Sequence, residues 1–269
     1  MVLYNIITSM EATVPKIIFI VPYRDRVQHK SLFERNMEHI MEDYDKKDYE
    51  IYFSEQRDDG REFNRGATKN IGFLAMKNLY PDHYKNITFV FNDVDCFPCM
   101  KNVLDYETEH GKIKHFYGFT YVLGGIFSIK GADFEKLNGF PNFWTWGYED
   151  NMIYNKALLD KSITVDRSVF FPIFDMNICH MADVQKRLIN VRQSGMSKDE
   201  HFKNNIHSLR DVNYKIEGNM IKILRFNVSL PYQEKIQQIE VKLGETDIKG
   251  IKKKYQRFNN RMPMRVGKR

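Results

Sequence analysis

The chain is poor in cysteine, tryptophan and proline. Its 269 residues include three Cys, two Trp and eight Pro. Cys96, Cys99 and Cys179 cannot all pair within the chain, and with no secretory signal we expect reduced thiols. Cys96 and Cys99 have CxxC spacing, but no second such pair is present to complete a zinc site. A redox role for this pair is not expected either.

Long hydrophobic runs are also absent. No segment approaches 18 consecutive apolar residues, and the first 14 residues have neither a basic start nor a compact apolar centre. We therefore predict neither a signal peptide nor a membrane anchor, and a chain that is cytoplasmic or otherwise soluble. Residues 1–15 are interpreted as an N-terminal extension.

Acidic residues are missing from the last part of the chain. Residues 249–269 contain nine Lys and Arg and no Asp or Glu, although the whole chain carries a net charge of only +6. Such a basic tail suits contact with an anionic membrane or nucleic acid. A solvated terminus is the simpler expectation, and no nucleic-acid partner is expected.

The remaining sequence predicts one α/β domain, residues 16–248. Apolar strands alternate with amphipathic helices, which is typical of parallel βαβ units with helices covering a mostly parallel sheet. The apolar face of the first helix is predicted to include Leu32, Met37, Ile40 and Met41, and that of the second Ile71, Leu74, Ala75 and Leu79. The predicted strands are 16–21, 49–54, 87–91, 116–119 and 125–129, and the predicted helices are 29–43, 65–79 and 149–159.

Two carboxylates follow the strand predicted at residues 87–91. Asp93 and Asp95 stand at its carboxyl end, and Pro22, Tyr23 and Arg24 stand at the end of the first strand. Ligands of such sheets bind beyond these ends, so we expect the two segments to share one site. A divalent cation bridging carboxylates to a diphosphate is the first hypothesis, with solvated aspartates as the alternative.

Four further motifs accompany this segment in order along the chain. They are Val21-Pro22-Tyr23-Arg24-Asp25-Arg26, Phe63-Asn64-Arg65-Gly66, Gly124-Gly125 with Asn138-Gly139-Phe140-Pro141-Asn142, and Phe143-Trp144-Thr145-Trp146-Gly147-Tyr148-Glu149-Asp150-Asn151. With these motifs, residues 16–215 resemble the beta-1,4-galactosyltransferase family. The resemblance implies a GT-A fold and a metal-dependent, inverting transfer from a UDP-sugar donor to a glycan or glycoconjugate acceptor. It also implies the Golgi lumen if an N-terminal anchor was trimmed.

The resemblance assigns roles at the nucleotide and metal. Asp95 and His180 would bind the metal, for which Mn²⁺ or another divalent cation is the expectation. At the position three residues before this histidine, where many relatives have a methionine as a further metal ligand, this chain has Asn177. Met176, Asn177 or a water would then complete the coordination shell of the metal. The residues expected to bind the nucleotide are Pro22, Tyr23, Arg24, Arg26, Phe63, Arg65, Asp93, Val94 and Gly125.

The resemblance also assigns the chemistry. Asp150, next to Glu149, would be the general base, and Trp146 would sit on a mobile loop over the sugars. Taken alone, acidic residues in a first turn merely complement the helix dipole. Val122 stands where galactose-specific relatives carry tyrosine, which leaves room for N-acetylgalactosamine or a related hexose. The alternatives are a metal-dependent nucleotidyltransferase and a catalytically silent carbohydrate-binding protein.

Overall fold

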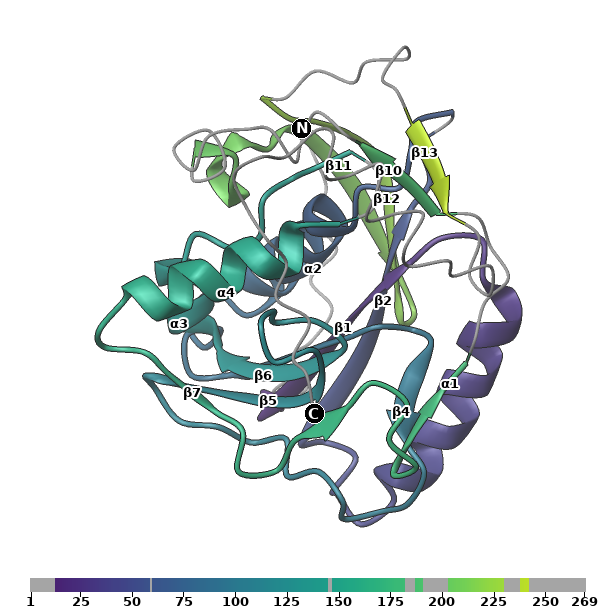
Figure 1. Cartoon of the computed structure of the whole chain (residues 1–269), viewed down its shortest axis with the longest axis vertical. Coiled ribbons are helices and arrows are strands. Elements are labelled where there is room, and N and C mark those ends of the chain that lie inside the picture. The colour runs from purple at the N-terminus through teal and green to yellow at the C-terminus, as the bar shows by residue number, and fades with distance from the viewer. Residues whose placement is uncertain are drawn as a thin grey trace, which may run out of the picture.

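The computed structural model describes residues 13–58, 60–144, 147–181, 187–190, 203–229 and 238–241. A central sheet separates two layers of helices (Figure 1). Helices α2 (Arg65–Leu79), α3 (Gly131–Lys136) and α4 (Glu149–Leu159) lie on one side of this sheet, and α1 (Val27–Ile40) lies on the other. The α/β prediction is therefore confirmed.

The central sheet is mixed and mostly parallel. Its strand order is β11-β12-β2-β1-β3-β6-β5-β7, with β8 paired to β5. The bounds are β1 Ile17–Tyr23, β2 Tyr49–Gln56, β3 Thr88–Asn92, β5 Lys112–Gly118, β6 Ile126–Lys130, β7 Thr164–Asp166, β8 Phe171–Pro172, β11 Arg210–Glu217 and β12 Met220–Asn227. Within the described part of this sheet, the antiparallel pairs are β11 with β12, β3 with β6, and β5 with β6.

Two small ladders lie outside the central sheet. Strand β4 (Cys96–Pro98) pairs antiparallel with β9 (Ile178–His180), and β10 (Arg187–Asn190) with β13 (Gln238–Val241). A short 3₁₀ helix, η2, spans Ile206–Ser208. The β4–β9 ladder matters for the site because it brings residue 180 beside the segment that follows β3.

Strand β1 contributes to the core on both of its faces. Ile18 and Ile20 pack in the cluster that includes residues of α2, whereas Ile17, Phe19 and Val21 pack in the cluster that includes residues of α1. All of these side chains are fully buried. A strand covered by helices on both sides reads as an unbroken apolar run, which is the pattern of residues 17–21.

The predicted helices at 65–79 and 149–159 are confirmed to the residue, and the other predicted elements are displaced by one to four residues at their ends. The prediction that Leu32 and Leu79 belong to the buried faces of their helices is wrong. Leu32 is 44% exposed and Leu79 is 47% exposed. In α1 the buried position is the neighbouring Phe33, and in α2 most of the helix from Gly66 to Met76 is buried, so its last turn projects beyond the core.

Among the described residues, no helix is long and apolar enough to cross a membrane. The basic segment 249–269 and residues 1–12 lie outside the described part of the chain. The proposed domain limits therefore remain predictions.

Candidate functional site

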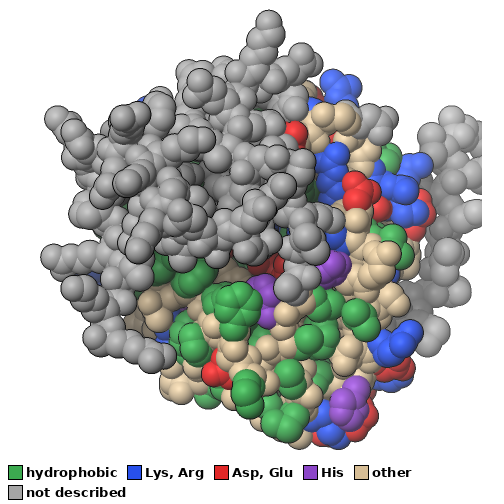
Figure 2. All heavy atoms as spheres, turned by 45° about the vertical axis from the view of Figure 1, so that its right-hand side comes forward, with side chains coloured by type: hydrophobic (Ala, Val, Ile, Leu, Met, Phe, Trp, Pro, Cys, Tyr) green, Lys and Arg blue, Asp and Glu red, His purple; other side chains and the backbone are tan. Residues whose placement is uncertain are grey.

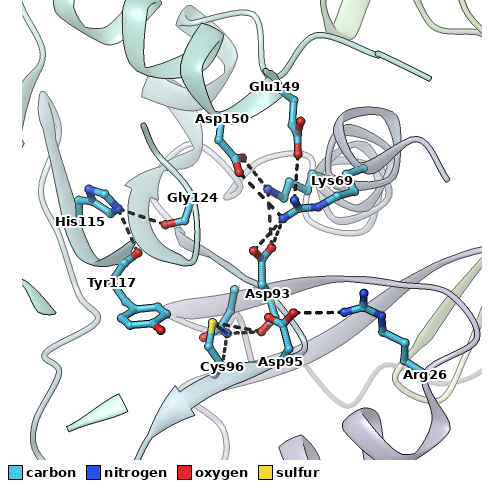
Figure 3. A network of polar contacts seen from close by, with 12 residues as sticks. Arg26, Lys69, Asp93, Asp95, Cys96, His115, Tyr117, Gly124, Glu149 and Asp150 are labelled. Carbon is cyan, nitrogen blue, oxygen red and sulfur yellow. Dashed lines mark hydrogen bonds and ion pairs between the residues drawn. The ribbon is translucent and has the colours of Figure 1, made fainter. Parts of the chain in front are cut away.

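The site is built where β3 ends. Asp93 follows the last residue of this strand, and its backbone N–H donates to the Gly125 carbonyl at 2.9 Å. Gly125 precedes β6, which runs antiparallel to β3, so its loop reaches the same edge of the sheet. The buried Asn92 side chain donates to the carbonyls of Asp93 and Cys96, both at 2.8 Å. This turn is thereby fixed, and it presents both aspartates at the sheet edge (Figure 3).

Helix α2 supplies two cations to this edge. Its N-cap is Asn64, whose side chain accepts from the Ala67 N–H at 2.9 Å. Arg65 and Lys69 stand one turn apart, so they lie on the same face of the helix. At Gly66, between them in sequence, the helix backbone comes close to the segment that contains Pro141. A Cβ at this position would lie 1.8 Å from the Pro141 carbonyl oxygen. Only glycine fits, which explains its presence at this point of the motif.

The cations meet carboxylates from β3 and α4 (Figure 3). Arg65 Nη2 donates to both oxygens of Asp93 at 2.7 Å, and Arg65 Nη1 lies 3.2 Å from Glu149 Oε1. Lys69 Nζ donates to Asp150 Oδ1 at 2.9 Å. Two longer ion pairs, Lys69 to Asp93 at 3.8 Å and Arg65 to Asp150 at 3.9 Å, close the network. Three carboxylates and two cations thus form one cluster.

The cluster shifts the pKa values of Asp93 and Asp150 in opposite directions. Burial by itself raises the pKa of Asp93, but the charges of Arg65 and Lys69 outweigh it and lower that pKa to about 2. At Asp150 burial dominates and raises the pKa to about 6, opposed first by Lys69. Asp93 is therefore a fixed anion, whereas Asp150 is a carboxylate able to take up a proton near neutral pH.

The loop between β5 and β6 packs against Asp150. The Leu123 N–H donates to the Asp150 carbonyl at 3.0 Å, and a Cβ on Gly124 would lie 2.6 Å from Asp150 Oδ2. Glycine thus lets the carboxylate approach the loop backbone. The fully buried His115 ring holds this loop, since its Nε2 lies 3.1 Å from the carbonyls of both Tyr117 and Gly124.

The β4–β9 ladder places Asp95 and His180 on neighbouring backbone segments. The Met181 N–H donates to the Asp95 carbonyl at 2.8 Å, and residue 180 pairs with residue 96. His180 Nδ1 lies 2.6 Å from the Tyr117 hydroxyl. The pKa of that hydroxyl is raised to about 12, chiefly by burial, with the Asp95 charge contributing. The predicted ligand pair is therefore brought to one place.

The donor set suits a divalent cation that keeps open positions. A carboxylate oxygen from Asp95 and an imidazole nitrogen from His180 are both acceptable to Mn²⁺. Tyr117 engages Nδ1 of the imidazole, which leaves Nε2 as the candidate ligand atom and fixes the ring. The described residues contain no group of three or more His, Cys, Asp and Glu side chains suited to a metal. Substrate oxygens or water would therefore complete the shell.

The residues predicted to bind the nucleotide differ in their burial and in their contacts. Arg26 Nη1 donates to Asp95 Oδ2 at 3.2 Å, and Arg24 Nη1 donates to the Arg61 carbonyl at 2.5 Å. Phe63 is half-buried, just before the N-cap of α2. In contrast, Pro22, Tyr23 and Val94 are buried, and the Tyr23 ring packs edge-on against Phe53.

The predicted lid is described only in part, because Trp146 and Thr145 lie outside the described residues. Trp144 is buried and stacks on Phe226 with ring centroids 5.4 Å apart. Gly147 has φ +110° and Tyr148 has φ +69°. A tyrosine in the left-handed region is unusual, so the chain turns sharply just before Glu149 and Asp150 enter α4.

Exposed rings lie near the site. Phe119 and Tyr121 are 50% and 53% exposed and stack on each other, and Phe174 packs on the His180 ring with centroids 5.4 Å apart. Figure 2 shows hydrophobic side chains gathered on one face, with histidine and acidic side chains among them. Apolar rings beside charged groups suit a ligand with both hydroxyls and apolar faces.

The sequence interpretation missed three residues of this site: Lys69, His115 and Tyr117. Lys69 carried a usable signal, because it stands four positions after Arg65 on a predicted helix and so shares a face with a predicted nucleotide-binding residue. Tyr117 lies in the predicted strand 116–119 and His115 just before it, and nothing in their spacing indicates their partners.

Comparisons with known proteins agree on one family. The profile described as the N-terminal region of glycosyl transferase group 7 matches residues 10–106, and that described as the N-terminal domain of galactosyltransferase matches residues 107–177. Beta-1,4-galactosyltransferase 1 of Mus musculus is 31% identical over 56% of this chain, and the xylosylprotein 4-beta-galactosyltransferase of Caenorhabditis elegans is 26% identical over 79%. The matches cover 39% and 75% of those proteins, respectively.

Solved structures show the same fold. The catalytic domain of Drosophila beta1,4galactosyltransferase 7 in complex with xylobiose aligns with a TM-score of 0.62 and 22% identity, covering 78% of this chain and 94% of that one. A mutant of that enzyme in complex with manganese, UDP-Gal and xylobiose aligns with a TM-score of 0.59 and 20% identity over the same shares. The GT-A prediction is confirmed.

Proposed function

This chain belongs to the beta-1,4-galactosyltransferase family, and on that premise we propose that it is an inverting glycosyltransferase. It moves galactose, N-acetylgalactosamine or a related hexose from a UDP-sugar to a hydroxyl of a glycan acceptor. The observation that carries the proposal is the charge cluster at the end of β3. In this cluster the buried Asp150 carboxylate pairs with Lys69, and its pKa is raised to about 6. The Drosophila relative bound manganese, UDP-Gal and xylobiose, which supports a donor and acceptor of these classes.

Asp150 is the proposed general base. Its carboxylate takes the proton of the acceptor hydroxyl while that oxygen attacks the anomeric carbon of the donor and the bond to the diphosphate breaks. UDP leaves with the electron pair. A base whose pKa lies somewhat below neutral is ionised at pH 7 yet still accepts a proton in the transition state. The single displacement inverts the configuration at the anomeric carbon.

Glu149 supports inversion by being unsuited to act as a nucleophile. Its side chain is 3% exposed and pairs with Arg65 at 3.2 Å. A retaining reaction by two displacements needs a carboxylate free to attack the sugar carbon. We therefore assign Glu149 to holding Arg65, and through it Asp93, in place.

The donor is proposed to lie over Asp93, Asp95 and Arg26. Asp95 and His180 would hold Mn²⁺ or another divalent cation, which when bound neutralises charge on the diphosphate as a Lewis acid. Arg26 lies 3.2 Å from Asp95, so its guanidinium is placed to contact a phosphate oxygen. Asp93, held as an anion by Arg65, would accept hydrogen bonds from the ribose hydroxyls.

The test is a screen of UDP-galactose, UDP-N-acetylgalactosamine and UDP-glucose with Mn²⁺ and sugar acceptors, xylosides among them. We expect acceptor-dependent UDP release and a product of inverted configuration by NMR. Asp150→Asn should reduce single-turnover rates by about 10²–10⁴-fold with donor affinity unchanged. Asp160→Asn, at the far end of α4 and paired with Lys136, is the matched control.

Other outcomes separate the alternatives. A nucleotidyltransferase would cleave within the diphosphate and release no UDP, and a silent binding protein would bind sugars without turnover. Near-normal transfer by Asp150→Asn would refute the assignment of the base.

A further inference from the structure

Lys69 is a buried lysine at the centre of the charge cluster. Its side chain is 2% exposed, and its ammonium group donates to Asp150 Oδ1 at 2.9 Å. The same nitrogen lies 4.6 Å from the centre of the Phe140 ring and 3.8 Å from Asp93 Oδ1. An ammonium removed from water in this way is tolerated only when it is paired, so the short contact to Asp150 is the main compensation for its burial.

The two cations of α2 serve different carboxylates. Arg65 makes its short contacts to Asp93 and Glu149 and lies 3.9 Å from Asp150. Lys69 makes its shortest contact to Asp150. Removing Lys69 would therefore leave the buried Asp150 carboxylate with Arg65, 3.9 Å away, as its remaining cationic partner within 4 Å among the described residues.

The position of Lys69 is fixed by packing. Asn70, the next residue, donates to the Phe140 carbonyl and to Asn142 Oδ1, both at 2.8 Å, and Gly66 permits the close approach of α2 to Pro141. The ammonium is thereby held between the Phe140 ring and Asp150 of α4. A rigidly held donor restricts the rotation of the carboxylate that it contacts.

We propose that Lys69 is a positioning residue for the transfer reaction, a role that rests on the function proposed above. Its ammonium group holds Asp150 Oδ1 by a charge-assisted hydrogen bond, keeps the carboxylate ionised, and leaves Oδ2 to take the proton of the acceptor hydroxyl. Lys69 touches neither substrate nor reacting atom in this scheme.

The groups that face Asp150 support this role. They are Lys69 and Arg65 from α2, Asp93 after β3, and Glu149 on the same helix. Burial raises the pKa of Asp150, Glu149 and Asp93 raise it further, and Lys69 is the largest influence that lowers it. Without Lys69 the carboxylate would be protonated over more of the neutral range and would fail as a base there.

The test compares Lys69→Met with the wild type in single-turnover transfer from pH 5.5 to 9. Methionine keeps the length of the side chain and removes its charge. We expect the acid limb of the rate profile to move upward by about one pH unit or more, the size of effect that an adjacent opposite charge has on a carboxyl group. Donor affinity should stay unchanged.

The matched control is Lys77→Met. Lys77 stands on the same helix and also pairs with a carboxylate and an aromatic ring, Glu135 and Tyr84, but away from the site. Its variant should keep the wild-type profile. If Lys69→Met slows transfer equally at every pH, its role is structural and the proposal is overturned.

A second measurement does not depend on activity. In urea unfolding at pH 7.5, Lys69→Met should lower the midpoint much more in the wild type than in an Asp150→Asn background, because the neutral amide no longer needs a cation. If Lys69→Met alone does not fold, recovery of folding in the double variant supports the pairing. Equal losses in both backgrounds, or no recovery, overturn it.

The two proposals fail in different ways. Undiminished transfer by Asp150→Asn refutes the base, whatever Lys69 does. An inactive Asp150→Asn variant together with an unshifted profile for Lys69→Met refutes only the role of Lys69.

Discussion

His115 makes folding sensitive to acid, and the size of this effect follows from its surroundings. The ring is fully buried, its Nδ1 accepts from Arg167 Nε at 3.0 Å, and its Nε2 lies 3.1 Å from two carbonyls. This arrangement requires the neutral ring with its proton on Nε2. Burial, and then the charge of Arg167, lower the pKa of His115 to about 4.

The sign of the pH dependence follows from that direction. A histidine whose folded pKa lies below the unfolded value of about 6.5 stabilises the fold fully above pH 6.5, and the stability is lost as the pH falls toward 4. The difference of about 2.5 pH units corresponds to about 3 kcal/mol in total. At pH 5 the loss relative to pH 7.5 is about 2 kcal/mol.

The assay is urea unfolding of the wild type and of His115→Gln at pH 7.5 and pH 5. Glutamine does not titrate, and its amide retains a donor for the carbonyls. The stability difference between the two proteins should therefore be about 2 kcal/mol more favourable to the wild type at pH 7.5 than at pH 5. Using the difference between proteins removes the opposite pH dependence of Asp150, whose raised pKa favours the fold at lower pH.

Parallel stability curves for the two proteins would refute the reasoning, because they would mean that His115 does not titrate differently in the folded and unfolded states. His39→Gln is a suitable control. Its side chain is 62% exposed on α1 and takes no part in the contacts of His115, so it controls for the exchange of histidine for glutamine itself.

Three further outcomes are expected. Asp95→Ala and His180→Ala should each abolish Mn²⁺-dependent donor binding in calorimetric titration while the protein stays folded, and retained affinity in both would contradict the metal assignment. Val122→Tyr should disfavour an N-acetylated donor relative to galactose by about 1–3 kcal/mol in competition assays, and an unchanged ratio would place Val122 away from the sugar. Gly66→Ala should cost about 1–3 kcal/mol in urea unfolding, because its Cβ would meet the Pro141 carbonyl at 1.8 Å; an unchanged midpoint would contradict the overlap.

The local patterns of the sequence determined the elements that position the site. The run at residues 17–21 is apolar throughout because β1 is covered on both sides, and the helix at 65–79 begins where Asn64 caps it. The placement of Asp93 and Asp95 at a sheet edge follows from the strand before them. These features depend on neighbours along the chain, so they can be read without the fold.

Only the tertiary structure decided which charges meet. Lys69 and Asp150 are 81 positions apart, and Tyr117 and His180 are 63 apart. The spacing within a helix says which face a residue shares, but not which distant segment packs against that face. The acidity of Asp150 has the same origin, since burial sets it and the opposing charges of Lys69 and Arg65 limit it. Strand pairing and helix packing assemble these groups, because hydrophobic burial on both sides of the sheet fixes where α2 and α4 lie.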